Sequence, residues 1–426
     1  MDANRKTAYF TLMDVEGKKS YSNLALNHQV IVGRPDSVAF VRQLVYGVLE
    51  NKLYLDYLIQ QYVKNPVENM RNCEKTILRM GIYQIRFMES VPSYAAVNES
   101  VILAKRFCRG KEGFINGVLR NYLRTGDEIK LPNHEEDEVE YLSIKYSYAP
   151  WIVKMWLENY ESSFTEELLG AGNQTPDLVI RPNLLKITRD DLWSKLEEKG
   201  YGVKEGNLIS DSLHVKGQEL LSDPLFKNGM FSVMDESSMM VVSMLAPLPG
   251  EFIMDVCAAP GGKTIYMAEK MGNDGKIIAQ DIYRRKLNLV NQEAKRNGTT
   301  IVQVRAWDAT RLDSSLEEKA DRVLVDAPCS GLGVLRRKPE IKYKKYDSEM
   351  RDLPLKQLEI LLTSASYVKR NGVLVYSTCT INPEENHRVV LEFLKRNPLF
   401  EKEESIQLLP NVNDTDGFYI CRMKRK

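Results

Sequence analysis

Short apolar runs alternate with helical patterns from about residue 250 to the end of the chain. The apolar runs are typical of buried strands and lie at 252–257, 276–281, 301–307, 321–326 and 372–378. The helical patterns fall between and after them, near 263–271, 284–297, 354–370 and 384–396. This alternation favours a doubly wound parallel sheet, in which ligands bind outside the carboxyl ends of the strands. The residues that follow each run are therefore candidates for a functional site.

The rest of the chain predicts two further domains, because 426 residues are too many for one ordinary core. Residues 1–130 predict an all-helical domain, since apolar residues recur there at helical spacing. Residues 140–245 mix helical patterns with a strand candidate, which favours a small α+β domain. Residues 246–426 then form the α/β domain. An acidic stretch near residue 136 predicts the linker between the first two.

Composition narrows the class of protein. The chain is 43% hydrophobic and 27% charged, as expected of a globular protein in water, and its apolar runs are too short to span a membrane. The N-terminus lacks the apolar stretch of a signal peptide. Six cysteines without a CxxC pair, and four dispersed histidines, favour neither a disulfide framework nor a metal site. We therefore expect no metal, no membrane contact and a location in the reducing cytosol. Four cysteines are interpreted as inert small hydrophobes: Cys73, Cys108, Cys257 and Cys421.

A glycine loop follows the first apolar run, with the sequence AAPGGKT at 258–264. The two glycines allow close backbone approach, and the helix that begins there favours an anionic group. The loop matches neither GxGxxG nor GxxxxGK[ST], which argues against a dinucleotide or a phosphate loop. The candidate cofactor residues in this loop are Cys257, Ala258, Ala259, Pro260, Gly261, Gly262 and Lys263.

Three aspartates lie at the ends of the next runs. Asp281 is placed to accept from ribose hydroxyls, Asp308 from an adenine amine, and Asp326 lies close to the expected reaction centre. Acidic groups in this order suit a neutral adenosine and an ammonium group, and they would repel a polyphosphate. The predicted cofactor is therefore S-adenosylmethionine rather than NAD or ATP. The alternative for any single aspartate is turn capping.

Two cysteines follow apolar runs directly. Cys329 lies in DAPCSG at 326–331, and Cys379 lies in YSTCT at 376–380. Both thiols would reach one crevice, which suggests covalent catalysis. A thiolate that adds to C6 of a pyrimidine makes C5 nucleophilic enough to accept a methyl group, and the thiol leaves once the C5 proton is removed. Cys379, Cys329 and Asp326 can supply the nucleophile, the help in elimination and the contact to the ring N3 edge. The residues alone do not rank the two thiols.

Basic residues follow the Cys329 loop. A polyanion could enter the crevice there, so we expect phosphate contacts from Arg336, Arg337, Lys338 and Lys342. The alternative is an ordinary solvated surface.

These motifs resemble a known family. The segments MDVCAAPGGKT (254–264), DAPCSG (326–331), STCTI (377–381) and PEEN (383–386) are similar to the RNA cytosine-C5 methyltransferases of the NOL1/NOP2/Sun group. The segments at 77–84, 91–99 and 116–120 resemble the NusB-type RNA-binding helical domain. The resemblance implies a Rossmann-like methyltransferase domain, S-adenosylmethionine as cofactor, Cys379 as nucleophile and Cys329 as the thiol that assists product release. It further implies a monomeric cytoplasmic enzyme acting at cytosine 967 of bacterial 16S rRNA, naked or in an early assembling subunit.

The sequence leaves three other functions open. A NusB-type domain can act alone as an RNA-binding factor, although here it is fused to a full catalytic set. A tRNA or other RNA cytosine-C5 methyltransferase would share the catalytic core, and the N-terminal helical domain argues against it. A DNA methyltransferase would use the Pro-Cys thiol as nucleophile and would leave Cys379 unexplained.

Overall fold

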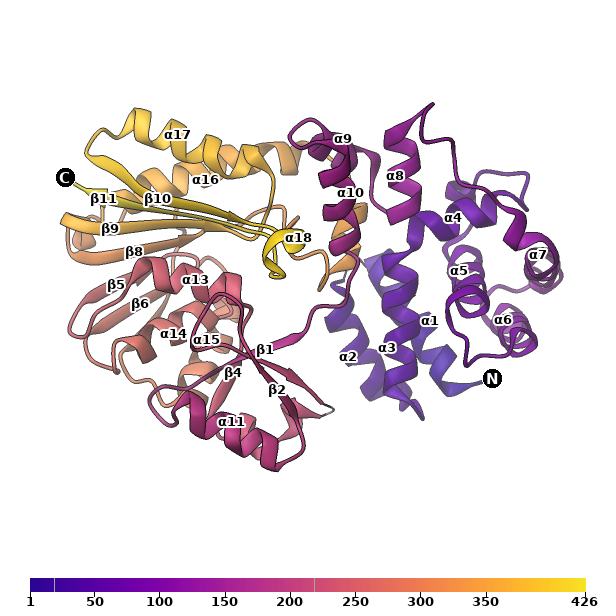
Figure 1. Ribbon diagram of the computed structural model, residues 1–426, viewed down its shortest axis with the longest axis horizontal. Coiled ribbons are helices and arrows are strands. Elements are labelled where there is room, and N and C mark those ends of the chain that lie inside the picture. Colours follow the sequence, from indigo (N-terminus) through magenta and orange to yellow (C-terminus); the bar gives the residue numbers. More distant parts are fainter. Residues whose placement is uncertain (19, 218) are drawn as a thin grey trace. The chain divides into compact units, whose positions relative to one another are not determined.

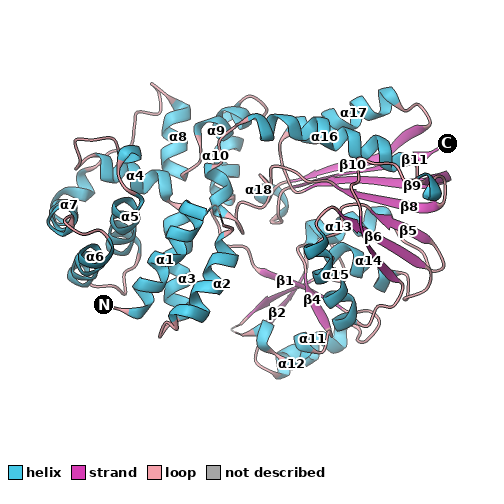
Figure 2. Ribbon diagram, turned by 180° about the vertical axis from the view of Figure 1, so that it is seen from behind, coloured by secondary structure: helices cyan, strands magenta, loops and turns pink. Residues whose placement is uncertain are grey.

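The computed structural model describes residues 1–18, 20–217 and 219–426. The chain forms two compact units: Met1–Gln174 together with Leu335–Lys345, and Thr175–Val334 together with Tyr346–Lys426. The first unit is helical and the second contains the sheets, as the colours of Figure 2 show. No helix in the described part of the chain has the length and apolar character needed to cross a membrane.

The first unit confirms the prediction of a helical N-terminal domain. Its longer helices are α1 (Ala3–Lys18), α2 (Ser22–Gly33), α3 (Val38–Glu50), α4 (Lys52–Gln60), α5 (Asn72–Phe87), α6 (Ser93–Phe107), α7 (Glu112–Thr125), α8 (Glu138–Tyr146), α9 (Pro150–Leu157) and α10 (Ser162–Ala171). Helix α3 shows why the pattern is helical. The Ser37 hydroxyl caps it by accepting from the Phe40 N–H, and its apolar face buries Val41, Leu44 and Val45 completely.

Helices α8 to α10 pack with the first unit, although the sequence places them at the start of the middle domain. Helix α8 lies against α4. Their apolar side chains are buried, with Leu142, Ile152 and Trp156 at most 1% exposed. The compact first unit therefore extends to Gln174.

The segment Leu335–Lys345 also packs within the first unit, although the sequence assigns it to the C-terminal domain. Its 3-10 helix η5 (Pro339–Tyr343) carries the anchoring side chain. The Tyr343 hydroxyl donates to the backbone carbonyl of Glu50 at 3.1 Å and accepts from the Lys52 N–H at 3.2 Å. The stretch 246–426 is therefore not one continuous body.

Cys73 and Cys108 are joined by a disulfide, so the prediction that both are unpaired hydrophobes is wrong. The two helices that carry them explain the pairing. Cys73 lies in the first turn of α5 and Cys108 follows α6, and these helices pack together so that the start of one meets the end of the other. The sequence separation of 35 positions between the two cysteines hides this proximity in the sequence.

The second unit begins with a four-stranded antiparallel sheet in the order β2-β3-β1-β4. Its elements are β1 (Leu178–Pro182), α11 (Arg189–Glu198), β2 (Gly202–Glu205), β3 (Leu213–Lys216), α12 (Pro224–Lys227) and β4 (Phe231–Val233). This confirms the small α+β region, and β1 is the strand that the sequence predicts near 177–181.

The large sheet has seven strands in the order β10-β11-β9-β8-β5-β6-β7. The strands are β5 (Phe252–Asp255), β6 (Lys276–Asp281), β7 (Val302–Ala306), β8 (Ala320–Asp326), β9 (Val368–Thr378), β10 (Phe400–Leu408) and β11 (Phe418–Arg425). Strands β5 to β9 pair in parallel, which confirms the Rossmann-like prediction. Strands β10 and β11 pair antiparallel, so the sheet is mixed rather than wholly parallel.

Helices cover both faces of the large sheet (Figure 1). The helices are α13 (Glu236–Leu245), α14 (Gly262–Lys270), α15 (Arg284–Asn297), α16 (Ser348–Ala365), α17 (His387–Arg396) and the short α18 (Pro410–Asn413). Helices α16 and α17 pack on β8, β9 and β10, while α13, α14 and α15 pack on strands from β11 to β7. The central strands are consequently buried on both faces, which is why they appear in the sequence as continuous apolar runs.

Candidate active site

The strand order places the predicted site residues along one edge of the large sheet. The parallel strands β9, β8, β5, β6 and β7 are neighbours in that order, so their carboxyl ends form a row. Cys379, Asp326 and Asp281 follow or end three of these strands. The sequence-predicted catalytic and cofactor residues therefore lie at one edge, in the order of the strands.

The two predicted catalytic thiols are in contact. The Sγ atoms of Cys329 and Cys379 lie 3.2 Å apart, and both side chains are half-buried. Register explains this meeting across 50 residues, because Asp326 on β8 pairs with Ser377 on β9 and each cysteine follows within a few positions. The hydrogen bond with Cys379, followed by burial, raises the pKa of the Cys329 thiol well above its ordinary value. This shift favours the protonated form of the Cys329 thiol, and either sulfur can be the donor in the hydrogen bond between them.

A buried carboxylate ties the two cysteine loops together. Glu385 is fully buried and accepts hydrogen bonds from the Ser330 N–H at 2.8 Å and the Asn382 side-chain amide at 3.0 Å. Ser330 follows Cys329, and Asn382 lies three residues beyond Cys379. Gln357 donates both to Glu385 and to the carbonyl of Pro328. The sequence contained Glu385 only as part of a family motif, and no local pattern signals this long-range role.

Asp326 is held by two partners. Its Oδ1 accepts from the Ser377 hydroxyl at 2.8 Å, and its Oδ2 accepts from the Lys263 ammonium at 2.6 Å. Burial opposes the charge of Lys263, but the Asp326 carboxylate outweighs it, so the pKa of Lys263 is raised. A charged pair thus connects the glycine loop to the Cys329 strand. The sequence places Lys263 in the candidate cofactor loop, and no local pattern identifies Asp326, 63 residues away, as its partner.

The glycine loop needs glycine at its tightest point. Gly261 has φ +111°, and a Cβ there would lie 3.1 Å from the Cα of Val290. Beneath the loop, Asp255 is buried and accepts from the Thr264 hydroxyl at 2.7 Å. Burial raises the pKa of Asp255 to about 7. Burial also raises the pKa of the Cys257 thiol well above its ordinary value, which suits a packing role rather than a reactive one.

The remaining predicted cofactor aspartates differ from each other. Asp281 uses Oδ1 to accept from the Tyr283 N–H at 2.8 Å, and no described residue donates to its Oδ2. Asp308 caps a turn by accepting from the N–H and the hydroxyl of Thr310, and Arg311 lies 3.9 Å from its other oxygen. Asp281 therefore fits a hydrogen-bonding ligand such as a ribose, while turn capping accounts for one oxygen of Asp308.

The predicted phosphate contact by Lys342 is wrong. Its side chain is fully buried in the first unit, where the ammonium donates to Asn173 and lies 4.4 Å from the ring centre of Tyr148. Burial lowers its pKa to about 7. Arg336 is also buried, at 7% exposed. Arg337 and Lys338 stay partly exposed, and the Lys338 ammonium lies over the Tyr21 ring. A basic run can therefore anchor a segment as well as bind a polyanion.

A Rossmann-like methyltransferase of the S-adenosylmethionine-dependent class is the class of protein that this fold and site define. Family models match along the chain: the NusB family at residues 2–124, the RsmF/B-like ferredoxin-like domain at 148–219, and 16S rRNA methyltransferase RsmB/F at 242–424. The ferredoxin-like match begins in the α9–α10 region, so those helices belong to the middle domain by sequence and to the first unit by packing.

Similar proteins cover the whole chain. A probable ribosomal RNA small subunit methyltransferase B from Bacillus subtilis is 35% identical over 99% of this chain and 98% of that protein. A protein with the same description from Synechocystis is 32% identical over the full length of both. The crystal structure of PH0851 has a TM-score of 0.85 and 25% identity, and covers 98% of both chains. The chain belongs to the 16S rRNA methyltransferase RsmB/F family.

Proposed function

We propose that this protein transfers a methyl group from S-adenosylmethionine to C5 of a cytosine in 16S rRNA, at position 967, through a covalent bond between Cys379 and C6. The observation that carries this proposal is the contact of the two thiols, 3.2 Å apart, beside the Asp326–Lys263 pair. A metal has no role in this chemistry. The alternative is a tRNA or other RNA cytosine with the same catalytic residues.

The chemistry assigns one role to each side chain. The Cys379 thiolate adds to C6, and the electron pair gained by the ring makes C5 nucleophilic. The cofactor supplies an electrophilic methyl group, which C5 takes up. A base, here a water molecule or hydroxide from solvent, takes the C5 proton; the electron pair of that C–H bond restores the ring double bond, and the bond between C6 and the Cys379 sulfur breaks with its electron pair on sulfur. Cys329, which retains its proton beside Cys379, is placed to protonate the leaving thiolate and so assist product release.

Asp326 is the proposed contact for the target base. An ionised carboxylate only accepts hydrogen bonds, so it suits the amino group of cytosine and a protonated N3. The Ser377 hydroxyl and the Lys263 ammonium hold this carboxylate in place. A uracil has a carbonyl oxygen where cytosine has the amino group, and that oxygen would face the carboxylate unfavourably. The proposal therefore accounts for a preference for cytosine.

Substitution of Asp281 is expected to weaken cofactor binding. Asp281→Ala should raise the dissociation constant for S-adenosylmethionine by about one to two orders of magnitude, because a charged acceptor of ribose hydrogen bonds is lost. Asp308→Ala should have a smaller effect, since one Asp308 oxygen already caps a turn. Isothermal titration calorimetry of the three proteins measures both. Equal affinity in the wild type and Asp281→Ala would contradict this assignment of the cofactor site.

RNA binding by the basic segment is expected to depend on Lys338 and not on the buried Lys342. Lys338→Gln should reduce the slope of log affinity against log salt by about one, because one phosphate contact is lost. Lys395→Gln, at an exposed position on α17, is the control and should leave the slope unchanged. Filter binding of 16S rRNA fragments at several salt concentrations measures the slopes. Equal slopes for Lys338→Gln and the control would show that the segment is an ordinary solvated surface and does not contact phosphates.

The proposed location follows from the proposed substrate. Since an rRNA-modifying enzyme works where ribosomes are assembled, we propose a monomer in the cytoplasm that acts on naked rRNA or an early assembling subunit. The Cys73–Cys108 disulfide gives no support to a reducing compartment, so this location depends on the substrate alone.

Bisulfite sequencing of RNA from a deletion strain tests the target directly. Loss of 5-methylcytosine at position 967 of 16S rRNA, with restoration by the wild-type gene, is the expected result. A lost signal in tRNA with 16S rRNA unchanged would favour the alternative function.

A further inference from the structure

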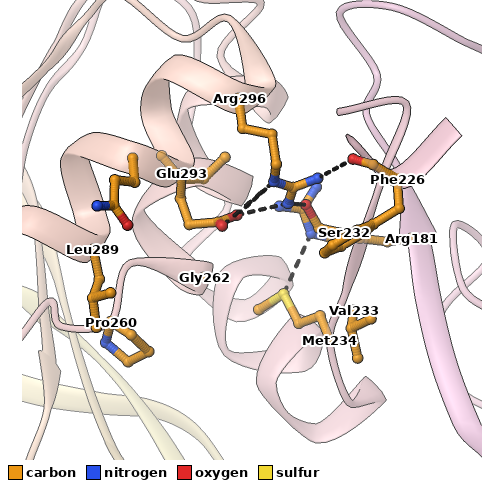
Figure 3. Close-up of a pocket in the computed structure, with 12 residues that line it drawn as sticks. Arg181, Phe226, Ser232, Val233, Met234, Pro260, Gly262, Leu289, Glu293 and Arg296 are labelled. Atoms are coloured by element: carbon orange, nitrogen blue, oxygen red, sulfur yellow. Dashed lines mark hydrogen bonds and ion pairs between the residues drawn. The ribbon is translucent and has the colours of Figure 1, made fainter. Parts of the chain in front are cut away.

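A pocket lies between the small sheet and the methyltransferase helices of the second unit (Figure 3). One wall comes from β4 and the residues beside it, including Val233 and Met234. The opposite wall comes from α15, including Leu289. Pro260 and Gly262 of the glycine loop close one side, and the cavity measures about 280 Å³. The pocket thus shares a loop with the predicted cofactor site but is separate from the two thiols.

The charged side chains that line the pocket are paired, Arg181 with the buried Glu269 behind the wall. Arg296 is paired with Glu293, and its guanidinium donates to the carbonyls of Phe226 and Phe231. The same guanidinium lies 4.4 Å from the ring centre of Phe226. Because each charged side chain already has a partner, a phosphate bound in the pocket would form few favourable electrostatic contacts. A planar, uncharged ring that stacks on a guanidinium or an aromatic side chain fits better.

The rim adds apolar surface and a group that can recognise a base edge. Leu289 is 46% exposed and Val233 is 41% exposed, and they lie on opposite sides of the pocket in Figure 3. The side chain of Gln292, on the same wall as Leu289, forms no hydrogen bond with the residues that the structure describes. Its amide carries donors and an acceptor, as hydrogen bonding to a nucleobase requires.

Helix α15 also carries positive charges that could bind the phosphates of an RNA backbone beside the pocket. Arg284, Arg285 and Lys286 are exposed in its first turn, and Lys295 is exposed near its end. Exposed cations along one helix attract phosphates, whereas the pocket itself favours a neutral ring. A basic surface beside a part-apolar cavity with paired charges matches a nucleotide in a single strand, whose phosphate is charged and whose base is neutral and planar.

We propose that this pocket receives one unstacked base of the RNA substrate, distinct from the cytosine that is methylated. The inference rests on the proposed function for the nature of the substrate, and it adds a site that helps select or position the RNA. Phosphates on either side of the bound base lie along α15. The base itself stacks within the walls formed by β4 and α15.

Substitutions at the rim, combined with abasic RNA, test this site. Leu289→Glu and Val233→Glu place a carboxylate at the mouth from opposite walls, and both positions are exposed enough to tolerate the change. Leu391→Glu on α17 is the matched control, since Leu391 is a 62% exposed leucine on another helix. A 16S rRNA fragment is prepared as a series, each member with one nucleotide replaced by an abasic residue. Dissociation constants are measured for every protein and fragment.

One abasic position away from the target should weaken binding to the wild type and to Leu391→Glu by about fivefold to a hundredfold, the range for loss of one stacked base. In Leu289→Glu and Val233→Glu, the same abasic position should raise the dissociation constant by less than about twofold, because those proteins have already lost the contact with this base. If each abasic position reduces the affinity equally in all four proteins, the proposal is overturned. The pocket would then be empty in the RNA complex or bind a protein partner.

Methylation measured on the same fragments separates this proposal from the function on which it rests. If the protein methylates cytosine C5, but no abasic position weakens binding less in the rim variants than in the wild type, the pocket proposal is wrong and the proposed function stands. If one abasic position shows this smaller effect in the rim variants, but cytosine C5 is not methylated, the proposed reaction is wrong and the pocket proposal stands. RNA that fails to bind the wild type under all salt conditions contradicts both.

Discussion

Replacement of Cys379 by alanine is expected to abolish methyl transfer, with a loss of at least about four orders of magnitude in rate. The effect is this large because C5 of cytosine is not nucleophilic until a thiolate has added to C6. The variant should also form no covalent complex with RNA. A radiolabelled methyl-transfer assay and a denaturing gel measure the two outcomes.

The companion variant Cys329→Ala should behave differently. Addition and methyl transfer precede the step that Cys329 assists, so a defect in that step accumulates the covalent complex. We expect a protein–RNA band that survives denaturation. Cys421→Ala is the control for loss of a thiol, because Cys421 is buried and its pKa is raised to about 12 by burial. This control should turn over without a stable adduct. An adduct from Cys379→Ala, and none from Cys329→Ala, would reverse the two roles.

Removal of Glu269 is expected to destabilise the second unit by about 3–5 kcal/mol, which corresponds to a fall of about 10 °C in melting temperature. Glu269 on α14 pairs with Arg181 on β1, and both side chains are at most 1% exposed. Glu269→Ala leaves the Arg181 guanidinium charged and buried without its partner. The pair also joins the small sheet to the methyltransferase helices, so its loss should separate their unfolding transitions.

Calorimetry of the wild type and three variants tests this expectation. Glu392→Ala is the control, because it removes a surface ion pair with Arg396 on α17 that is worth less than about 1 kcal/mol. A double variant, Arg181→Met with Glu269→Leu, should recover part of the lost stability, since neither charge is then buried alone. A melting temperature for Glu269→Ala equal to that of Glu392→Ala would show that the buried pair does not stabilise this unit.

The parallel strands and their functional ends could be predicted from the sequence because burial on both faces produces continuous apolar runs. Strand β8, for example, buries Val323, Leu324 and Val325 completely. Strand β10 could not be found in this way, because its residues 401–405 are exposed and mostly charged. Exposure removes the apolar signal, although backbone pairing with β11 still forms the strand.

Features that depend on distant partners were also hidden. The pairing of Cys73 with Cys108 follows from the packing of α5 against α6, and the anchoring of Lys342 follows from a cavity formed by the helical unit. Glu385 positions both cysteine loops through hydrogen bonds to residues as far as 55 positions away. Local spacing carries no information on such contacts. The identity of a site residue was therefore easier to predict than the residues that hold it.

The identity of the sulfur that bonds to RNA is the most direct test of the proposed reaction. The Cys329→Ala protein is incubated with the 16S rRNA fragment and S-adenosylmethionine, denatured, digested with trypsin and nuclease, and analysed by mass spectrometry. Cleavage after lysine and arginine puts residue 379 in the peptide 371–388 and residue 329 in the peptide 323–336. We predict a methylated cytidine on peptide 371–388, attached at Cys379. A nucleotide on any other peptide, or an unmodified Cys379 in protein that has methylated the RNA, would contradict the account.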